Sequence, residues 1–287
     1  MKVVFHADDF GLTEGVNGGI VEAYQRGVLR STSLMVTAPA FEDAVACAKA
    51  APGLDVGVHL TLVEEAPVLP PDRIPSLVQE GRFWSSHGTV GLRWLARRWR
   101  SEEACAELRA QLDRFAATGL AASHLDGHQH LHLLPGVFAG VAAEARRRGI
   151  RYVRTTLADP LPDGSPPRAA TLLALRAVGW VAARYAAGAD RRALAPFLTV
   201  GFLHAGGTLT RARLLGVLDR VRRHRPDAIV EVMLHPGRPD DEARRRYGHW
   251  RYQWENDFAL LVDPALPAEL LRRGVEVTSF RELAAVP

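Results

Sequence analysis

The chain has 287 residues, of which 47% are hydrophobic and 24% charged, an ordinary globular composition that excludes a disordered or fibrous protein. Its formal net charge of +4 is too small to indicate nucleic-acid binding, so we expect no nucleic-acid partner. Cys47 and Cys105 lie far apart and form no metal-binding spacing, which is typical of a reducing, cytoplasmic compartment. The N-terminal apolar run is too short for a signal peptide.

Strand-like and helix-like segments alternate along the chain. The strand candidates span residues 3–7, 32–37, 56–62, 123–127, 152–155, 200–204, 229–234 and 275–279. Helical patterns lie between them, near residues 16–27, 40–50, 101–118, 136–148, 168–187, 209–224 and 267–273. Such alternation is typical of βαβ units with a parallel sheet. Seven or eight units predict an α/β fold, a single (β/α)-barrel domain over residues 1–287. The long, proline-rich loop at 63–91 is expected to shape the mouth of its site.

Ionisable side chains follow several of the predicted strands. Asp8 and Asp9 come directly after the first strand, in "VVFHADDFG", and His59 lies near the end of the third. His235 follows the seventh strand, and the histidine-rich stretch "SHLDGHQHLH" begins on the fourth. Catalytic groups of a parallel barrel come from the carboxyl ends of several strands. We therefore expect these side chains to share one site.

The histidine-rich stretch cannot place all its rings on one ion if it is extended. A strand rises ~3.3 Å per residue, so His124 and His132 would lie about 26 Å apart. Catalytic zinc-like sites use about three protein ligands and leave a position open for water. We predict one divalent ion, with ligands drawn from three strand ends: Asp9, His59 and His128.

Asp8 then remains free beside the predicted metal ligands, and we interpret it as the base that acts on water. This role would explain two adjacent carboxylates at the end of a strand. Arg154, at the end of the fifth predicted strand, is expected to orient Asp8 or to bind substrate oxygens. Asp126 is the first candidate for orienting the ligands, and His124, His130 and His132 are further candidates.

The ligand set leaves the metal and the reaction class open at this point. One carboxylate and two imidazoles suit zinc and other first-row ions, and they do not exclude Mg²⁺. The extra groups, Asp8 and Asp126 among them, would also suit a second ion and a metal-dependent phosphoesterase. A non-catalytic sugar- or lipid-binding protein is disfavoured, because the full set of chemical residues is present. The oligomeric state is also open.

Four segments resemble the YdjC-like carbohydrate deacetylases, a family that includes chitooligosaccharide deacetylases (ChbG). They are "HADDFGLTEGVNGGIVEAYQRGVLRSTSLMV", "GVHLTL", "HLDGHQHLH" and "VMLHPG", in order between residues 5 and 237. The resemblance implies an irregular (β/α) barrel related to polysaccharide deacetylases, and hydrolysis of an N-acetyl group on an amino sugar. It also implies Asp9, His59 and His128 as metal ligands, Asp8 as the base, and His235 as the acid that protonates the leaving nitrogen.

Two further segments bear on the substrate. The stretch "HPGRPDDEARRRYGHWRYQWENDFALLVDP" and the apolar segment 168–188 resemble the branch of this family associated with hopanoid biosynthesis (HpnK). That resemblance implies the N-acetylglucosaminyl head group of a hopanoid glycolipid as substrate, with soluble N-acetylated oligosaccharides as the alternative. Segment 168–188 contains Arg176 and Arg184, so we interpret it as a buried or interfacial helix and not a membrane span.

A basic, aromatic segment is the candidate region for contact with a membrane. "VGLRWLARRWR" at 90–100 interleaves Trp94 and Trp99 with four arginines, a pattern typical of helices that lie in a membrane interface. The alternative is a surface helix that packs its tryptophans on the barrel. With a lipid-linked substrate, we expect peripheral contact at the inner face of the membrane.

Overall fold

The computed structural model describes residues 1–155, 197–201 and 206–285. The apolar helix expected at 168–187 and residues 202–204 of a predicted strand lie outside the described residues.

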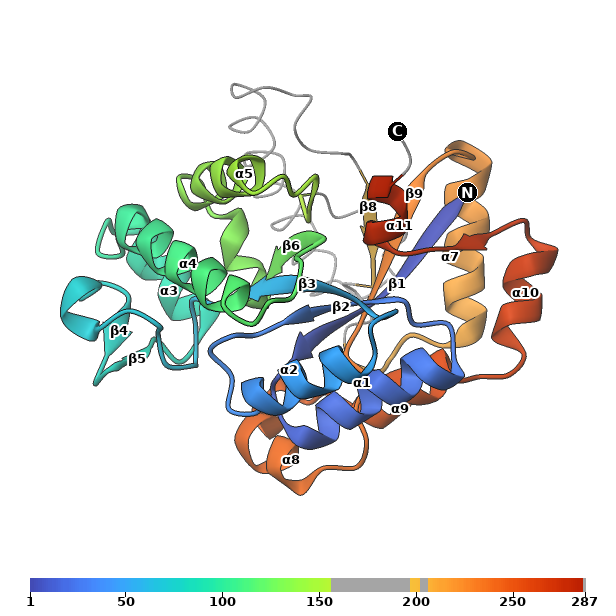
Figure 1. Ribbon diagram of the computed structural model, residues 1–287, viewed down its shortest axis with the longest axis horizontal. Coiled ribbons are helices and arrows are strands. Elements are labelled where there is room, and N and C mark those ends of the chain that lie inside the picture. The colour runs from blue at the N-terminus through green and yellow to red at the C-terminus, as the bar shows by residue number, and fades with distance from the viewer. Residues whose placement is uncertain (156–196, 202–205, 286–287) are drawn as a thin grey trace.

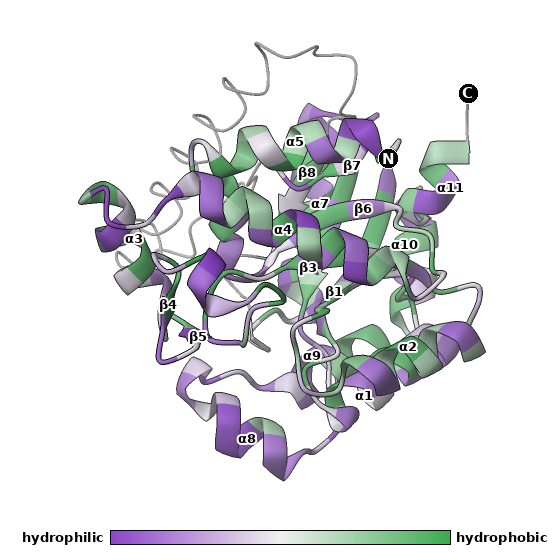
Figure 2. Cartoon of the chain, turned by 60° about the vertical axis from the view of Figure 1, so that its left-hand side comes forward, coloured by the Kyte–Doolittle hydropathy of each residue, from purple (hydrophilic) through white to green (hydrophobic). Residues whose placement is uncertain are grey.

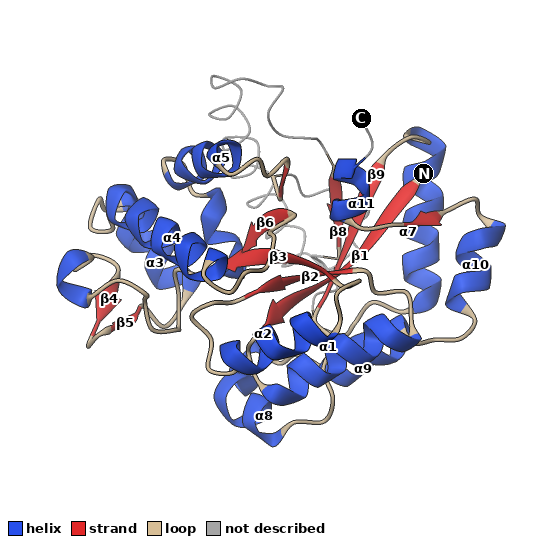
Figure 3. Ribbon diagram, viewed as in Figure 1, coloured by secondary structure: helices blue, strands red, loops and turns tan. Residues whose placement is uncertain are grey.

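A curled parallel β-sheet forms the centre of the structure, with helices packed around it (Figures 1 and 3). In space its strands follow the order β7-β6-β3-β2-β1-β9-β8, and β10 pairs with the first residues of β1. All of these pairings are parallel, which confirms the predicted α/β fold. The strands are β1 (Lys2–Phe10), β2 (Ser31–Leu34), β3 (Asp55–Leu60), β6 (His124–Gly127), β7 (Tyr152–Val153), β8 (Leu198–Val200), β9 (Ile229–Leu234) and β10 (Glu276–Val277).

Amphipathic helices connect the strands and bury one face each. In α1, Val16, Ile20 and Ala23 share the buried face, and the Thr13 side chain caps the helix by accepting from the Val16 N–H. Helices at the positions predicted from periodicity are α1 (Glu14–Arg26), α2 (Phe41–Ala50), α4 (Ser101–Ala116), α5 (Val137–Arg147), α7 (Arg211–His224) and α10 (Leu266–Arg272). Helices without a sequence prediction are α8 (Asp241–Tyr247), α9 (Trp254–Leu261) and α11 (Phe280–Ala285).

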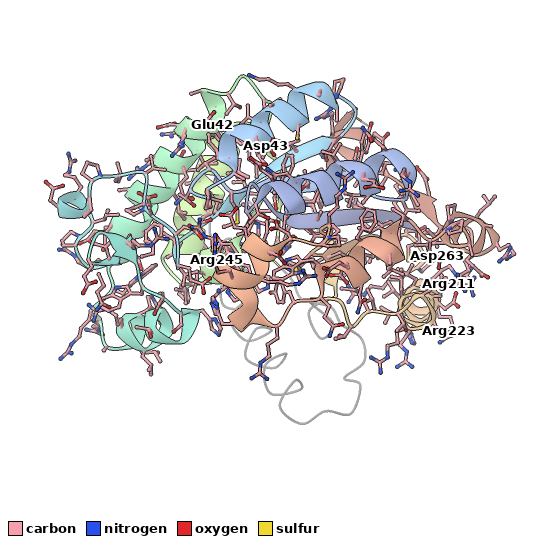
Figure 4. The ribbon with its side chains drawn as sticks, turned by 90° about the horizontal axis from the view of Figure 1, so that it is seen from below. Glu42, Asp43, Arg211, Arg223, Arg245 and Asp263 are labelled. Carbon is pink, nitrogen blue, oxygen red and sulfur yellow. The ribbon has the colours of Figure 1, made fainter. Side chains whose placement is uncertain are left out.

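Polar contacts between helices complete the outer layer. Arg211 at the start of α7 pairs with Asp263 beyond α9, at 2.6 Å, and both side chains are labelled in Figure 4. Asn17 on α1 donates to Asp43 on α2 at 2.8 Å. Figure 2 shows α8 as a mostly hydrophilic helix, because its sequence is rich in arginine and acidic residues.

The segment expected to be one long loop contains short elements. A 3-10 turn, η1 (Pro71–Arg73), precedes an antiparallel hairpin formed by β4 (Val78–Gln79) and β5 (Arg82–Phe83). The hairpin turn is tight, because Glu80 and Gly81 both take positive φ angles, 51° and 80°. Two-residue strands are too short to show a period of two, so the sequence pattern could not reveal them.

The basic, aromatic segment begins as helix α3 (His87–Leu95) and turns its tryptophans inward. Trp99 is only 2% exposed, and Trp94 is half-buried against the core. Leu92 and Leu95 point outward instead and are 70% and 71% exposed. This agrees with the alternative in which the tryptophans pack on the barrel, whereas the leucines are left on the surface. Within the described part of the chain, no helix combines the length and apolarity needed to span a bilayer.

Candidate active site and metal centre

A bulge in the first strand brings the two adjacent aspartates into one cluster. The sequence predicted that the first strand ends before them, but β1 runs through both aspartates. Its register with β2 shifts between Ala7 and Phe10, and Asp9 has a φ angle of 65°. In a regular strand neighbouring side chains point to opposite faces, whereas a bulge re-aims them. Asp8 and Asp9 are therefore both buried, at 2% and 1% exposure, and the charge of both interacts with the ring of His59.

Asp9, His59 and His128 form a compact trio of metal-type ligands. They come from β1, from β3 and from the start of a 3-10 turn, η2 (His128–Leu133). Asp9 Oδ1 lies 3.3 Å from His59 Nε2 and 3.0 Å from His128 Nδ1, and one ligand atom from each residue lies within 4.8 Å of the others. Asp9 Oδ2 is buried with no hydrogen-bond partner among the described residues. A cation bound by the trio would satisfy this oxygen, so the residues present fit a metal ion.

Electrostatic coupling within the trio ties metal binding to proton release. Burial disfavours the charged ring of His59, but Asp126 and Asp9 outweigh it and raise the pKa of His59 to about 10. Burial opposes the charge of His128 as well, and Asp9 and Glu64 outweigh it and raise its pKa to about 9. Burial also disfavours the charged form of Asp9, but His128 and His59 hold the pKa of Asp9 well below its usual range. Without a metal, both rings are therefore protonated near neutral pH.

We expect metal binding at pH 7 to release about two protons per ion, because both imidazoles must become neutral ligands. The sign follows from the raised pKa values: metal affinity should increase with pH until both rings have lost their protons, up to about pH 10. Calorimetric titration of metal into metal-free protein in buffers of different ionisation enthalpy measures the released protons. A binding enthalpy independent of the buffer would contradict this assignment.

Polar partners hold the far sides of the two histidines. His59 Nδ1 lies 2.9 Å from Asp126 Oδ1 and 3.0 Å from Ser33 Oγ, and Ser33 donates to Asp126 Oδ2 at 2.9 Å. Asp126 reaches this position because it pairs directly with His59 in the β3–β6 register. His128 Nε2 faces Glu64 Oε2 at 3.4 Å. These contacts fix the ring orientations that a metal ligand requires.

Asp8 is held by Arg154, just after β7, in a buried ion pair. Arg154 donates from Nη1 to Asp8 Oδ2 and from Nη2 to Asp8 Oδ1, both at 2.8 Å. The same guanidinium donates to Glu231 at 2.7 and 3.0 Å and lies 2.9 Å from Asp126 Oδ2. Burial raises the pKa of Asp8, but Arg154 and His6 outweigh it and hold that pKa well below its usual range. Asp8 is thus ionised at neutral pH.

The other histidines of the histidine-rich stretch lie near the Asp8–Arg154 ion pair. His124 Nε2 lies 2.8 Å from His6 Nε2, and burial lowers the pKa of His124 well below its usual value. His132 Nε2 contacts the Arg154 carbonyl oxygen at 2.9 Å. His130 is half-buried in η2 with a left-handed φ of 59°. The stretch is coiled from residue 128 onward, so the extended geometry assumed from the sequence is wrong.

His235 lies beside the trio, directly after β9. Its Nε2 is 4.0 Å from Asp9 Oδ2, and its ring packs on Tyr252 with centroids 4.6 Å apart. Asp257 on α9 accepts from the His235 backbone N–H at 2.9 Å and thereby fixes the chain at this point. Burial lowers the pKa of His235, although Asp9 and Asp8 oppose that effect.

Aromatic rings from the segment after β9 line the site. Trp250, in a 3-10 turn η4 (Gly248–Trp250), packs on His128 with ring centroids 5.0 Å apart. Tyr247 and Tyr252 pack on Trp250 at 4.6 and 5.5 Å. Glu64 accepts from Trp250 Nε1 at 3.0 Å. A wall of aromatic rings beside a polar centre suits a ligand with both C–H faces and polar groups.

Several residues of the site were missed by the sequence reasoning. His6 lies two positions before Asp8 and so belongs to the same strand face, which was an available signal. Glu231 is the single charge within the apolar β9 sequence "IVEVML", and such a buried charge needs a partner. Ser33 and Glu64 carried no comparable signal, because each stands beside another polar residue, Thr32 and Glu65, and is not an isolated polar group in an apolar run.

Comparison with known proteins agrees with this architecture. The sequence matches the YdjC-like protein family over residues 2–272. It is 34% identical to a carbohydrate deacetylase of Geobacillus stearothermophilus, covering 97% of this chain and 96% of the relative. It is 31% identical to a chitooligosaccharide deacetylase of Salmonella paratyphi B, covering 98% of each.

A solved structure shares the fold over nearly the whole length. It belongs to a candidate cellobiose-phosphate cleavage protein of Enterococcus faecalis V583, with a TM-score of 0.76, 25% identity and 98% coverage of both chains. This likeness extends through the curled parallel sheet and the helices around it. The chain belongs to the YdjC-like protein family.

Proposed function

We propose that this protein is a metal-dependent hydrolase that removes the N-acetyl group from an acetylated amino sugar. The observation that carries the proposal is the buried Asp9 Oδ2 within the trio, which has no hydrogen-bond partner in the described part of the chain and lies near an ionised Asp8 and His235. The deacetylase names of two relatives support the same class of reaction. The products would be acetate and a free amine.

The ion would be held by Asp9, His59 and His128, with nitrogen donors in the majority. Such a donor set favours zinc or another first-row ion over Mg²⁺. When bound there, a divalent ion supplies Lewis acidity that polarises an amide carbonyl and lowers the pKa of water. The protein's own part is to keep the three ligands buried and oriented through Asp126, Ser33 and Glu64.

Asp8 would take a proton from the attacking water. Its Oδ1 contacts both Arg154 and His6, whereas Oδ2 accepts from Arg154 Nη1, which leaves a lone pair on Oδ2 for water. Arg154 keeps the carboxylate ionised and fixes its plane. His235, whose Nε2 lies 4.0 Å from Asp9 Oδ2, would donate a proton to the leaving nitrogen, so that the C–N bond breaks to an amine and not to an amide anion.

A single ion is the proposed stoichiometry, which separates this enzyme from a two-metal phosphoesterase. Two further groups of metal-type ligands share Asp126: one contains His6 and His124, and the other contains Asp8 and His59. The Arg154 guanidinium already lies there, with Nη2 2.9 Å from Asp126 Oδ2 and 3.3 Å from His6 Nδ1. A cation added beside this fixed positive charge would be repelled.

For the substrate itself, we propose the N-acetylglucosaminyl head group of a hopanoid glycolipid, met at the inner face of the membrane. Two features support it: the sequence resemblance to the hopanoid-associated branch, and the outward Leu92 and Leu95 of α3 beside exposed arginines. A soluble N-acetylated oligosaccharide is the second candidate, supported by the chitooligosaccharide deacetylase relatives. Acetate release from each substrate by metal-reconstituted protein tests both. Release from neither substrate would contradict the proposed function.

The exposed leucines of α3 allow a separate test of membrane contact. Leu92→Asp combined with Leu95→Asp should abolish flotation of the protein with anionic liposomes at low salt, because charged side chains are excluded from the membrane interface. Leu271→Asp is the matched control, since Leu271 is 78% exposed on α10. Wild-type protein that stays unbound in this assay would rule out the membrane contact and leave the hydrolytic site unaffected.

A further inference from the structure

A polar cavity of about 480 Å³ lies next to the metal centre. Its walls come from the β4–β5 hairpin, from the segment that follows β3, and from α8 with the turn after it. The volume falls within the range of sites that bind small molecules, about 300–1,000 Å³. None of the roles proposed above for the trio, Asp8 or His235 uses this space.

The cavity contains fixed polar groups over an aromatic floor. Glu65 is buried there, with Oε1 accepting from the Tyr247 hydroxyl at 2.7 Å. Arg82 donates to the Glu64 carbonyl oxygen at 3.0 Å and approaches Glu65 Oε2 at 3.5 Å. Phe83 and Tyr247 are both buried against this cavity. The polar atoms are thus held in place by contacts that do not depend on a ligand.

Glu64 joins the cavity to the trio. It lines the cavity, and its Oε2 lies 3.4 Å from Nε2 of the proposed ligand His128. Its Oε1 accepts from His249 at 2.8 Å and from Trp250 at 3.0 Å. Glu64 therefore lies between the proposed ligand His128 and the cavity, so a group attached to a substrate at the trio could extend past it into this space.

We propose that this cavity binds a hydroxyl-rich unit linked to the acetylated sugar, either a second sugar ring or a polyol. The inference rests on the proposed function, which places the acetamido group at the trio. Hydroxyl groups both donate and accept, and the lining offers acceptors on Glu65 and Glu80, donors on Arg82 and Arg246, and both on Gln79. An apolar group in the same space would displace water from these polar atoms and offer them no hydrogen bond in return.

The test compares four glycosides of N-acetylglucosamine that differ only in the attached unit. The units are methyl, a second N-acetylglucosamine (di-N-acetylchitobiose), glyceryl and octyl. Dissociation constants are measured by calorimetry on metal-stripped protein, which avoids turnover, and kcat/KM for acetate release is measured on metal-loaded protein. Gln79→Trp fills the cavity from β4, and Gln25→Trp on the exposed end of α1 is the matched control.

We expect one or both hydroxyl-rich glycosides to bind about tenfold more tightly than the methyl glycoside, from one or two added hydrogen bonds. Gln79→Trp should remove that gain, whereas Gln25→Trp should keep it, and the octyl glycoside should respond to neither change. A gain for chitobiose alone identifies a sugar ring as the occupant, and a gain for the glyceryl glycoside alone identifies a polyol.

The inference is overturned if neither hydroxyl-rich glycoside binds more tightly than the methyl glycoside, or if the gain survives in Gln79→Trp. It is also overturned if octyl glycoside binding is lost equally in that variant, because the cavity would then hold an apolar group. Absence of acetate release from all four compounds would contradict the proposed function, while the calorimetric comparison still decides the cavity.

Discussion

Replacing Asp9 with Asn should remove the metal and lower acetate release by about 10³-fold or more. Asp9 contacts both histidines of the trio and contributes its only carboxylate, and an amide oxygen is a much weaker ligand. Lewis-acid assistance is worth several kcal/mol, and each 1.36 kcal/mol is tenfold in rate. Asparagine tolerates the left-handed φ of 65° at this bulge, so the fold should persist. Metal content by mass spectrometry and acetate release measure the two effects.

Asp72→Asn serves as the control for this change, because Asp72 is exposed in the turn η1. It should retain the metal and the full rate. An Asp9→Asn protein that binds one ion with wild-type affinity and keeps its activity would remove Asp9 from the metal site.

Asp8→Asn and His235→Ala should each lower kcat by about 10²–10⁴-fold while one equivalent of metal remains bound, because each removes a proton-transfer group and leaves the trio intact. In Asp8→Asn, Arg154 keeps its contacts with Glu231 and Asp126, which limits the loss of stability. The expected signature is metal retention with loss of turnover. Steady-state kinetics with metal analysis distinguishes it from the Asp9 result.

His224→Ala is the matched control for His235→Ala, since His224 is exposed at the end of α7. It should leave kcat unchanged. Near-normal turnover in Asp8→Asn or His235→Ala would contradict the corresponding proton-transfer role. Loss of metal from Asp8→Asn would instead indicate that Asp8 is itself a ligand.

The position of the site could be predicted because a parallel sheet brings the ends of its strands to one edge. Asp9, His59 and His128 come from three separate parts of the chain, yet each lies at the end of a strand or just beyond it. The strands themselves were recognisable as apolar runs, since nearly all of β1 and β9 is buried. Fold and candidate ligands therefore followed from the same pattern.

Local backbone geometry within the site could not be predicted in the same way. The bulge at Asp9 and the coiled turn at Gln129 and His130 all use left-handed φ angles that the residue types do not demand. Glu64 shares this feature, with a φ angle of 67°. Such conformations persist only where the surrounding structure imposes them, and they gather at functional sites. The tertiary contacts that impose them are not visible in a local sequence pattern.

The contacts of Asp8 were also predictable from the sequence only in part. The sequence indicated Arg154 as a candidate to orient Asp8, because it ends a predicted strand. It gave no indication that Glu231 and Asp126 would share the guanidinium, since these three residues belong to different strands. That network now argues for a single ion, because it places a fixed positive charge against Asp126, which both further groups of metal-type ligands share.

The most direct test of the account is acetate release by one protein sample before and after its metal is removed and restored. Metal-stripped protein, metal-restored protein and metal-restored Asp9→Asn would each be given the N-acetylglucosaminyl glycolipid and di-N-acetylchitobiose. We expect no release from stripped protein, recovery of release with one equivalent of ion, and no recovery in the variant. Equal release from stripped and restored protein would contradict a metal-dependent deacetylase centred on Asp9, His59 and His128.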